Sequence, residues 1–584
     1  MSFLPNLRLM TVIYRGYWNK ILLSQVFALL MAAFMIFIPM QVSSIVNHAL
    51  DIHAAIDDAI LIALFAVLTG VFCMANVIYS VRISEATGNY IRNLIYTKVQ
   101  AFSFGNLDRF STGEMLTRLT SDVYQITIGV QLMLRALLMA PFAIIVSLVL
   151  VGITSPELIW ILFVVIILSL ATFGYAMMKM QKQFKSRQKS YDTVNNSLQE
   201  NMAGIRVVKA FVRQKFENEK FHEVNEEFRN ANVAPLHTNA FTLPSALFIM
   251  GIATFLLVMA GGPSVLAGSI QVGEILAFFQ YTFIIVAQMW QLSLLIPQIV
   301  SAEASAGRLK EIFDMVPDVT DAPDATVLDP SAVKGKIVFE DVSFTYDPSG
   351  KSRTLTGINL EIEPGETVAF LGANGSGKST LIGLIPRFYD VTSGRVTIDG
   401  VDVKNISQEN LRSIVGVALQ KAFLFSGKII DNLSFGRPDM SYDEAVTASK
   451  VADADGFVSN LPDTYDALVS RKGQNFSGGQ QQRLSMARAF AVKPKIIILD
   501  DSTSAVDVET EGRILDALPK FLTGVTRLIV ASRVSTALSA DKIVVMDKGE
   551  IVATGTHREL IGSSPLYREI FASQLGGLRK EDVS

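Results

Sequence analysis

The segment Val368-Ala-Phe-Leu-Gly372-Ala-Asn-Gly-Ser-Gly-Lys378-Ser-Thr380 decides the fold of the second half of the chain. Its apolar start is typical of a buried strand, and the apolar residues that follow Thr380 are typical of a helix. The stretch between them matches G-x-x-x-x-G-K-[ST], in which glycines let backbone N–H groups approach phosphates. The N-terminus of the following helix adds partial positive charge. We therefore predict a P-loop, the phosphate-binding loop of a nucleotide-binding domain.

A second apolar stretch ends in an acid, as a P-loop site requires. Ile496-Ile-Ile-Leu-Asp500 is typical of a buried strand. In such sites the lysine, here Lys378, reaches the β- and γ-phosphates, and the hydroxyl of Ser379 and the carboxylate of Asp500 hold Mg²⁺. Together the two elements predict a site for ATP or GTP.

The composition indicates that the rest of the chain is embedded in a membrane. Of its 584 residues, 50% are hydrophobic and only 18% are charged, whereas soluble domains carry about 25% charged residues. The formal net charge of −3 gives no case for a nucleic-acid partner. Cys73 is the single cysteine, so an intramolecular disulfide and a multi-cysteine metal cluster are excluded.

Six apolar runs in the first 300 residues each approach or exceed the roughly 20 residues that a spanning helix needs. A lipid-exposed backbone must satisfy its own hydrogen bonds, so these runs are expected to be helical. A signal peptide does not explain them, because the first run is too long and five more follow. The predicted spans are 21–46, 59–81, 131–153, 157–178, 243–267 and 273–297.

The loop charges predict the orientation of these spans. The connections after the second and fourth spans are rich in Lys and Arg, whereas those after the first, third and fifth have none. Because positive loops stay inside, both termini and the nucleotide-binding domain are expected in the cytoplasm. The two basic connections, about 50 and 65 residues long, have helical periodicity, so we expect the spanning helices to continue well into the cytoplasm.

A short linker separates the two predicted domains. Val316–Pro330 combines three prolines with four aspartates, a composition typical of a loop. We predict a transmembrane domain over residues 1–310, a linker over 311–335 and a nucleotide-binding domain over 336–584. The predicted fold is thus a membrane α-helical domain of six spans with long cytoplasmic extensions, fused to an α/β P-loop domain.

A further motif makes the resemblance specific. Asn475-Phe-Ser-Gly-Gly-Gln-Gln-Gln-Arg483 resembles the signature motif of ATP-binding cassette (ABC) proteins. Tyr346 matches the aromatic residue that stacks on adenine in that family, Gln420 matches the Q-loop glutamine, and Ser504–Asp507 matches the D-loop. Leu107–Glu114 and Glu200–Phe211 look like the two intracellular loops that carry coupling helices. From about residue 15 to residue 575 the chain resembles an ABC exporter half-transporter with the type I exporter fold.

The resemblance implies an ATP- and Mg²⁺-dependent transport enzyme that works as a dimer. In that family two chains enclose two ATP molecules, and each site pairs one chain's P-loop with the partner's signature. Gln420 would also meet Mg²⁺ and the membrane domain. The implied ATP-binding residues are Tyr346, Gly372, Asn374, Gly375, Ser376, Gly377, Lys378, Ser379, Thr380, Gln420, Asp500 and Asp507, with Ser477, Gly478, Gly479 and Gln480 facing the partner's ATP.

Two positions depart from the family pattern at the catalytic centre. Asp501 stands where the family usually has a glutamate that activates the attacking water, and Ser532 stands where it has a histidine near the γ-phosphate. The shorter carboxylate misplaces its charge, and a hydroxyl cannot supply the reach or the positive charge of imidazole. A shift near 1 Å in a catalytic group can cost roughly 10²-fold in rate. A third departure, Arg471, reverses the charge of the usual glutamate before an Arg-Gly pair.

These departures lead to the hypothesis of a heterodimer. The P-loop site of this chain, with Asp501 and Ser532, is expected to be degenerate and weakly hydrolytic. The intact signature would complete a working site with a second half-transporter that supplies Glu and His. An ordinary but slow site in a homodimer is the alternative.

The spans suggest the kind of compound that is carried. They contain many Phe and Met residues and no ring of acids or bases, and the last span adds glutamines. Such a lining suits hydrophobic or amphipathic drugs or lipid-like molecules, although the same residues also pack against lipid or other helices. We expect export across the cytoplasmic membrane. A siderophore or other small-molecule importer of the same fold and a nucleotide-gated regulatory subunit remain alternatives.

Overall fold

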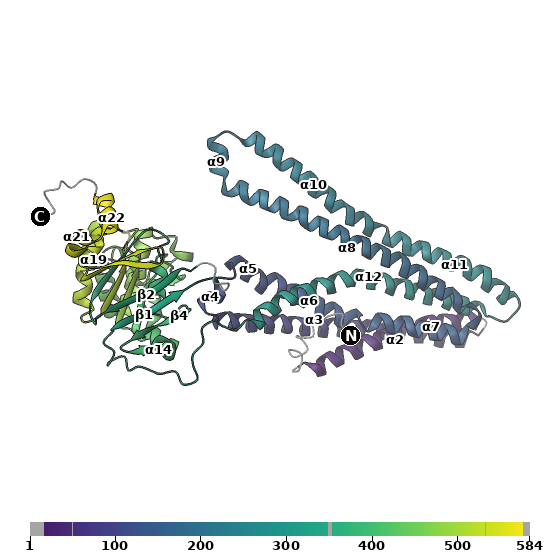
Figure 1. The fold of residues 1–584 in the computed structure, drawn as a ribbon. Helices are drawn as coiled ribbons and strands as arrows, with labels where there is room; N and C mark the ends of the chain where they lie inside the picture. The colour runs from purple at the N-terminus through teal and green to yellow at the C-terminus, as the bar shows by residue number, and fades with distance from the viewer. Residues whose placement is uncertain (1–16, 49–50, 348–352, 532, 576–584) are drawn as a thin grey trace. The chain divides into compact units, whose positions relative to one another are not determined.

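The computed structural model describes residues 17–48, 51–347, 353–531 and 533–575. The chain forms two compact units that interleave along the sequence (Figure 1). One unit contains the residues up to Gln100 together with Ser111–Met315. The other contains Ala101–Phe110 together with the residues from Val316 onward.

The first unit consists of helices, several of which are very long. They are α2 (Trp18–Asn47), α3 (Ile52–Gln100), α5 (Thr112–Thr117), a π-helical turn (Arg118–Asp122), α6 (Val123–Ala136), α7 (Met139–Thr154), α8 (Ile159–Ala203), α9 (Ile205–Ala210), α10 (Gln214–Ala240), α11 (Thr242–Leu266) and α12 (Val272–Asp314). A 3₁₀ turn (Pro156–Leu158) precedes α8.

Six stretches of this unit are long and apolar enough to cross a membrane, which confirms the predicted number of spans. They are Trp18–Asn47, Ile52–Gln100, Thr112–Thr154, Pro156–Ala203, Gln214–Leu266 and Val272–Asp314. Five of the predicted spans lie inside these stretches, and the fifth, 243–267, extends one residue beyond Leu266. At 1.5 Å per residue, the 49 residues of α3 extend about 74 Å, more than twice the roughly 30 Å hydrocarbon core of a bilayer.

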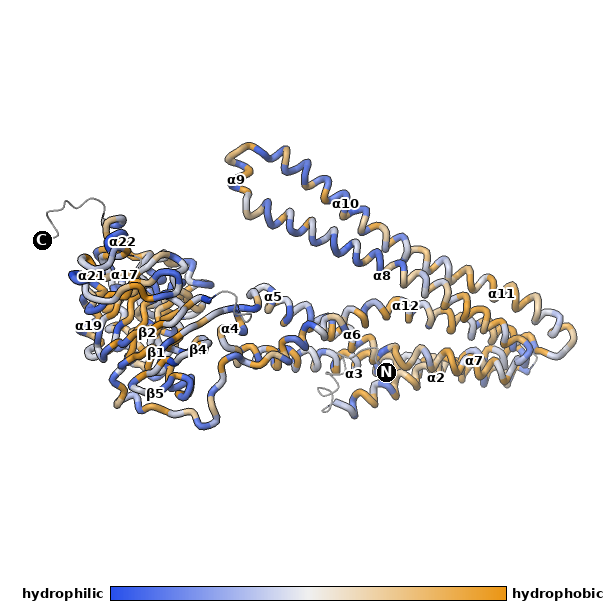
Figure 2. The backbone as a smooth tube through the Cα atoms, viewed as in Figure 1, coloured by the Kyte–Doolittle hydropathy of each residue, from blue (hydrophilic) through white to orange (hydrophobic). Residues whose placement is uncertain are grey.

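The hydropathy of α8 changes along its length, as the periodicity and charge predict. Figure 2 shows α8 and α10 apolar toward α11 and hydrophilic toward α9. The two helices lie side by side, joined by a hydrogen bond of 2.9 Å from Thr238 Oγ1 to Gln183 Oε1. At their hydrophilic end, Val207 of the short helix α9 and the two residues Phe211 and Val212 just after it are largely exposed.

Buried charges join the π-helical turn to the C-terminal part of α12. Asp122 is only 3% exposed, and its carboxylate accepts hydrogen bonds from the guanidinium of Arg308, one of them 3.0 Å long from Nε. Arg118, also buried, pairs with Glu114 and Glu311 at 3.0 Å each. Because a buried charge is costly without a partner, these pairs fix the two helices against each other.

The second unit is an α/β domain with two main sheets. An antiparallel sheet has the order β2-β1-β4-β5, and a mostly parallel sheet has the order β12-β11-β3-β10-β9-β6. The strands are β1 (Ile337–Phe344), β2 (Leu355–Ile362), β3 (Thr367–Leu371), β4 (Ser393–Ile398), β5 (Val401–Asp402), β6 (Val415–Ala418), β9 (Ile496–Asp500), β10 (Thr526–Val530), β11 (Lys542–Asp547) and β12 (Glu550–Gly555), with a small β7 (Gly427–Lys428) and β8 (Leu468–Val469) pair.

Helices cover these sheets and connect their strands. They are α13 (Lys378–Gly383), α14 (Gln408–Ile414), α15 (Ile429–Leu433), α16 (Tyr442–Val451), α17 (Asp455–Val458), α18 (Gly478–Ala491), α19 (Val508–Phe521), α20 (Val534–Ala537), α21 (His557–Ser563) and α22 (Pro565–Leu575). A four-residue helix, α4 (Phe104–Leu107), belongs to the same unit although it lies between α3 and α5 in the sequence.

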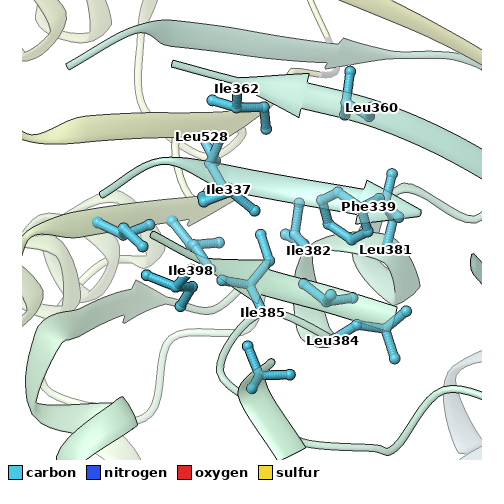
Figure 3. Close-up of a cluster of buried hydrophobic side chains, with 14 of the residues drawn as sticks. Ile337, Phe339, Leu360, Ile362, Leu381, Ile382, Leu384, Ile385, Ile398 and Leu528 are labelled. Atoms are coloured by element: carbon cyan, nitrogen blue, oxygen red, sulfur yellow. The ribbon is translucent and has the colours of Figure 1, made fainter. Parts of the chain in front are cut away.

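The core of this unit lies around α13, the helix that follows the P-loop. Leu381 and Ile382 of α13 pack with Ile337 and Phe339 of β1 and with Leu528 of β10 (Figure 3). All five are at most 2% exposed, and full burial of such a side chain contributes about 1.5–3 kcal/mol. The apolar core therefore fixes the position of the loop that begins α13.

The buried charges of the first unit generate a prediction about stability. Asp122→Asn keeps the shape of the side chain and removes its charge, which leaves the guanidinium of Arg308 with a weaker partner. We expect a loss of about 1.5–3 kcal/mol, the usual size of a hydrogen bond to a charged group. Thermal unfolding of the chain in detergent measures this loss. Asp192→Asn, at an exposed site on α8, is the control, and an equal effect of both changes would contradict the prediction.

Candidate nucleotide-binding site

Parallel strand pairing brings four predicted segments to one edge of the larger sheet. Val530 of β10 pairs with Phe370 of β3 on one side and with Asp500 of β9 on the other, and Ala418 of β6 pairs with Leu499. The segments that follow these strands therefore begin side by side. They are the P-loop, the residues after Asp500, the residues after Val530 and the segment that contains Gln420. The carboxyl edge of a parallel sheet is the usual place for a ligand site.

Two glycines of the P-loop have conformations that other residues rarely adopt. Gly372 has a φ of 150° and Gly377 a φ of 99°. A Cβ atom at Gly372 would overlap the carbonyl oxygen of Met546, and one at Gly377 would lie 2.7 Å from Leu355. The glycine pattern predicted from the sequence is therefore required by the fold of the loop itself.

Lys378 is held inside the curve of the loop. Its ammonium donates to the carbonyl oxygens of Gly372 and Ala373 at 2.8 and 2.9 Å, and to Ser376 Oγ at 3.2 Å. Burial lowers the pKa of Lys378, while the nearby carboxylates of Asp500 and Asp501 act in the opposite direction. The loop thus presents a cation surrounded by neutral carbonyls, an arrangement that suits phosphate oxygens as partners.

Ser379 and Asp500 meet directly, although 121 residues separate them in the sequence. Ser379 Oγ donates to Asp500 Oδ1 at 2.7 Å. Burial raises the pKa of Asp500, and the hydrogen bond from Ser379 partly offsets this. A hydroxyl and a carboxylate are hard oxygen ligands, which fit the Mg²⁺ ion that the motif implies.

Asp501 and Gln420, two of the predicted site residues, also meet. Gln420 Nε2 donates to Asp501 Oδ2 at 3.1 Å. The other oxygen, Oδ1, is buried and has no hydrogen-bond partner among the residues that the structure describes. The backbone of Asp501 has a φ of 47°, which lies in the left-handed region. The predicted Ser532 lies outside the described residues.

These residues surround a pocket of about 620 Å³. Its lining includes Gly372, Asn374, Gly375, Gly377, Lys378, Ser379, Thr380, Gln420 and Asp501. Ala531, which directly precedes the predicted Ser532, lines it as well. So do Thr354 and Gln574, which no sequence motif indicated. The pocket contains most of the predicted P-loop residues and is large enough for a ligand of nucleotide size.

Tyr346 lies beside this pocket, in a cluster of aromatic rings. Its ring meets those of Phe344 and Tyr389 edge to face, with centroids 4.8 and 5.1 Å apart. Its hydroxyl lies 3.2 Å from Thr380 Oγ1 in α13. Tyr346 lines a smaller pocket of about 200 Å³ that also reaches Ser379 and Asp500, rather than the P-loop pocket.

The segment Ala101–Phe110 contacts the same aromatic cluster. Phe104 stacks on Phe388 with centroids 4.2 Å apart, and Tyr389 donates a hydrogen bond of 2.7 Å to Asp108. That hydrogen bond and, more strongly, burial raise the pKa of Tyr389. Half of the first predicted coupling stretch, Leu107–Phe110, therefore belongs to the same compact unit as the candidate site, which the sequence did not predict.

The signature residues form the N-terminus of α18 and do not line the P-loop pocket of their own chain within the described ranges. Ser477 caps the helix, with its Oγ accepting from the N–H of Gln480 and its own N–H donating to Gln480 Oε1 at 2.9 Å. Ser477 and Gly478 are exposed, and Gly479 is half-buried against Ala505.

The D-loop residue Asp507 is also a helix cap in this structure. It precedes α19 and accepts a hydrogen bond of 2.9 Å from the N–H of Thr510. Backbone and side-chain hydrogen bonds with Thr510 lower the pKa of Asp507. The predicted role of Asp507 at the nucleotide stays a prediction.

Two residues that the sequence did not single out hold these segments in place. Gln482 accepts from the N–H of Ala505 at 2.9 Å and donates to the carbonyl oxygen of Gln420 at 3.4 Å. Glu511, only 4% exposed, accepts hydrogen bonds from Thr503, Thr536 and Arg533 at 2.6–2.9 Å. The segments after β6, β9 and β10 are thus tied together by buried polar side chains.

Comparisons with known proteins agree with this arrangement. Residues 21–289 match the family of the ABC transporter transmembrane region, and residues 355–504 match the ABC transporter family. The chain is 35% identical over 524 residues to the uncharacterized ABC transporter ATP-binding protein YfiB of Bacillus subtilis, covering 90% of each protein. It is 33% identical over 492 residues to an ATP-dependent lipid A-core flippase of Syntrophus aciditrophicus, covering 84% of this chain and 80% of the flippase.

A solved structure has the same fold. It is that of a bacterial Atm1-family ABC exporter with ATP bound, which superposes with a TM-score of 0.80 at 22% identity over 97% of this chain and 100% of that chain. This match confirms the predicted fold, a six-span exporter domain of type I fused to a nucleotide-binding domain. With both of its regions matched and relatives aligned over most of their length, the chain belongs to the ABC transporter family.

Proposed function

We propose that the chain is one half of an exporter that uses ATP to move hydrophobic or amphipathic compounds across the cytoplasmic membrane. The proposal is supported by the exporter fold and by the relative described as a lipid A-core flippase. In this proposal residues 1–310 form the transmembrane domain, 311–335 the linker and 336–584 the cytoplasmic nucleotide-binding domain. Both termini lie in the cytoplasm, in agreement with the basic connections.

The P-loop pocket is the proposed ATP site. The backbone N–H groups of the loop and Lys378 would hold the phosphates, and Ser379, Asp500 and Gln420 would hold Mg²⁺, which neutralises charge on the phosphates. Lys378 already has three oxygen partners, so a nucleotide replaces existing contacts rather than meeting a free cation. Tyr346 would stack on adenine in one of two ways. Its ring could leave its contacts with Phe344 and Tyr389, or it could keep them and offer a free ring face to the adenine.

The proposal that this site is degenerate rests on Asp501. Its carboxylate is one methylene shorter than glutamate, and Gln420 holds one of its oxygens at 3.1 Å. A general base must come within about 2.6–3.2 Å of its target, directly or through one water. A carboxylate that is short and already bonded to Gln420 is poorly placed to activate water. Ser532 adds a second loss, because a hydroxyl does not carry positive charge.

The signature residues support the proposal of a second chain. Ser477 and Gly478 are exposed at the N-terminus of the 14-residue helix α18, where backbone N–H groups and the helix dipole favour an anion. They do not line the P-loop pocket of their own chain. The exposed signature therefore fits the ATP of a partner, and we propose that this partner carries the glutamate and histidine that this chain lacks.

The interior of the membrane unit supports an amphipathic substrate. Gln288 of α12 is only 7% exposed, and its Oε1 has no hydrogen-bond partner among the described residues. Tyr281, seven residues earlier and therefore on a similar face of α12, is 2% exposed. Around them lie apolar side chains such as Ile285 and Met289. A few polar groups among many apolar ones fit a compound with a polar part and a large apolar part.

Removal of the P-loop amine tests the proposed ATP site. Lys378→Ala removes a charged donor, so we expect the affinity for a fluorescent ATP analogue to fall about 10- to 100-fold, the effect of a charge-assisted hydrogen bond. The titration uses the full chain in lipid nanodiscs. Lys450→Ala, an exposed lysine of α16, is the matched control and should bind as the unmodified chain does. Equal affinity in all three proteins would refute the assignment.

Restoration of the family residues tests the degenerate site. We expect the chain purified alone to hydrolyse Mg²⁺-ATP slowly, and Asp501→Glu with Ser532→His to raise turnover on the order of 10²-fold, because the carboxylate then reaches the water. Asp501→Asn with Ser532→His is the control that lacks the charge. Turnover of the unmodified chain as fast as that of the restored variant would show that Asp501 and Ser532 suffice.

Transport into inside-out vesicles tests the direction and class of substrate. Vesicles that contain this chain and the half-transporter that copurifies with it should accumulate a fluorescent amphipathic dye when ATP is added outside. Lys378→Ala should reduce this uptake, because the exporter needs ATP at both sites to close. ATP-driven loss of dye from the vesicles would indicate an importer. Flux that a non-hydrolysable ATP analogue supports equally well would indicate a nucleotide-gated subunit.

A further inference from the structure

The C-terminal helix α22 reaches the P-loop pocket, which the proposed function does not explain. Gln574, close to the end of α22, lines the pocket together with Lys378, Asp501 and Ala531. Its side-chain oxygen accepts a hydrogen bond of 2.7 Å from the backbone N–H of Val534. Val534 begins α20 and lies two residues after Ser532. One side chain therefore connects the end of the domain to the segment that follows β10.

The position of α22 is fixed by burial on the parallel sheet. Tyr567 is fully buried among Leu371 of β3, Ala531, which follows β10, and Val545 of β11. Its hydroxyl lies 2.7 Å from Nδ1 of His557 in α21. The ring of His557 also lies 5.2 Å from that of Phe571. These contacts hold α21 and α22 against each other and against the sheet. The position of Gln574 beside the pocket is therefore fixed by the packing of α22.

The segment that Gln574 contacts is held from the other side by a buried carboxylate. Thr536 Oγ1 and the guanidinium of Arg533 both donate to Glu511, at 2.6 and 2.9 Å. Arg533 and Thr536 are thus held by Glu511 of α19, while Val534 between them is held by Gln574 of α22. Loss of either anchor would free a segment that borders the proposed phosphate site.

We propose that Gln574 is a positioning residue of the ATP site, which holds Val534 at the start of α20 and makes α22 part of the nucleotide-binding surface. The inference rests on the proposed ATP site. It concerns nucleotide binding rather than hydrolysis, and it therefore holds whether or not the site turns over. It predicts that the amide of Gln574 is suited to the negative phosphates, whereas a carboxylate at the same place is not.

Two substitutions separate this role from a purely structural one. Gln574→Ala removes the acceptor for Val534, so we expect affinity for an ATP analogue to fall about three- to tenfold, as for one hydrogen bond. Gln574→Glu keeps an acceptor for Val534 but places negative charge at the pocket. Gln574→Glu should therefore weaken binding of the ATP analogue more than Gln574→Ala does. It should also weaken binding of the ATP analogue more than binding of the ADP analogue, which carries less negative charge. Ser573→Ala, at the preceding exposed position, is the matched control.

The experiment measures two quantities on the full chain in nanodiscs. Titration with fluorescent ATP and ADP analogues gives the affinities, and hydrogen exchange of a peptide that begins several residues before Val534 and ends at Ala537 gives the protection of the contacted backbone N–H. We expect Gln574→Ala to lose protection and Gln574→Glu to keep it while binding ATP worst. Unchanged affinity in both variants, or full recovery of affinity in Gln574→Glu, would overturn the inference. Failure of the unmodified chain and the Ser573→Ala control to bind would instead refute the proposed ATP site.

Discussion

The parallel pairing of β3, β10, β9 and β6 is the constraint on which the candidate site depends. Because Phe370, Val530 and Asp500 lie opposite one another across three strands, the chain leaves the sheet at the same level in each. Residues more than 100 positions apart in sequence then meet, such as Ser379 and Asp500. A slip of one residue in this register would turn every side chain of the slipped strand to the other face of the sheet. The buried core around α13 makes such a slip costly.

Polar side chains complete what strand pairing begins. The strands end at one edge, but the segments after them are loops, whose positions must be set by other contacts. Gln482 joins the Q-loop to the D-loop, and Glu511 joins Thr503, which directly precedes the D-loop, to the segment after β10. Each of these side chains is buried, where an unpaired polar group costs about 1–3 kcal/mol. The loops are thus held in place, because movement of a loop would leave a buried polar group unpaired and lower the stability of the domain.

The sequence was sufficient for features encoded locally and insufficient for those set by tertiary packing. The P-loop, the strand ending at Asp500 and the six spans depend on residue order within short windows, so pattern and hydropathy predicted them. The place of Phe104 in the nucleotide-binding unit could not be predicted, because its contact with Phe388 joins residues 284 positions apart. Gln574 and Glu511 gave no signal for the same reason: a single polar residue on a helix has no distinctive spacing.

We expect this chain to bind ATP at its own P-loop and to hydrolyse it only slowly. Native mass spectrometry of the purified chain in nanodiscs, after incubation with Mg²⁺-ATP and removal of free nucleotide, measures the number of chains and the identity of what stays bound. We expect that intact ATP is retained. Retention of ADP by a homodimer would contradict it, because Asp501 and Ser532 would then support hydrolysis without a second kind of chain.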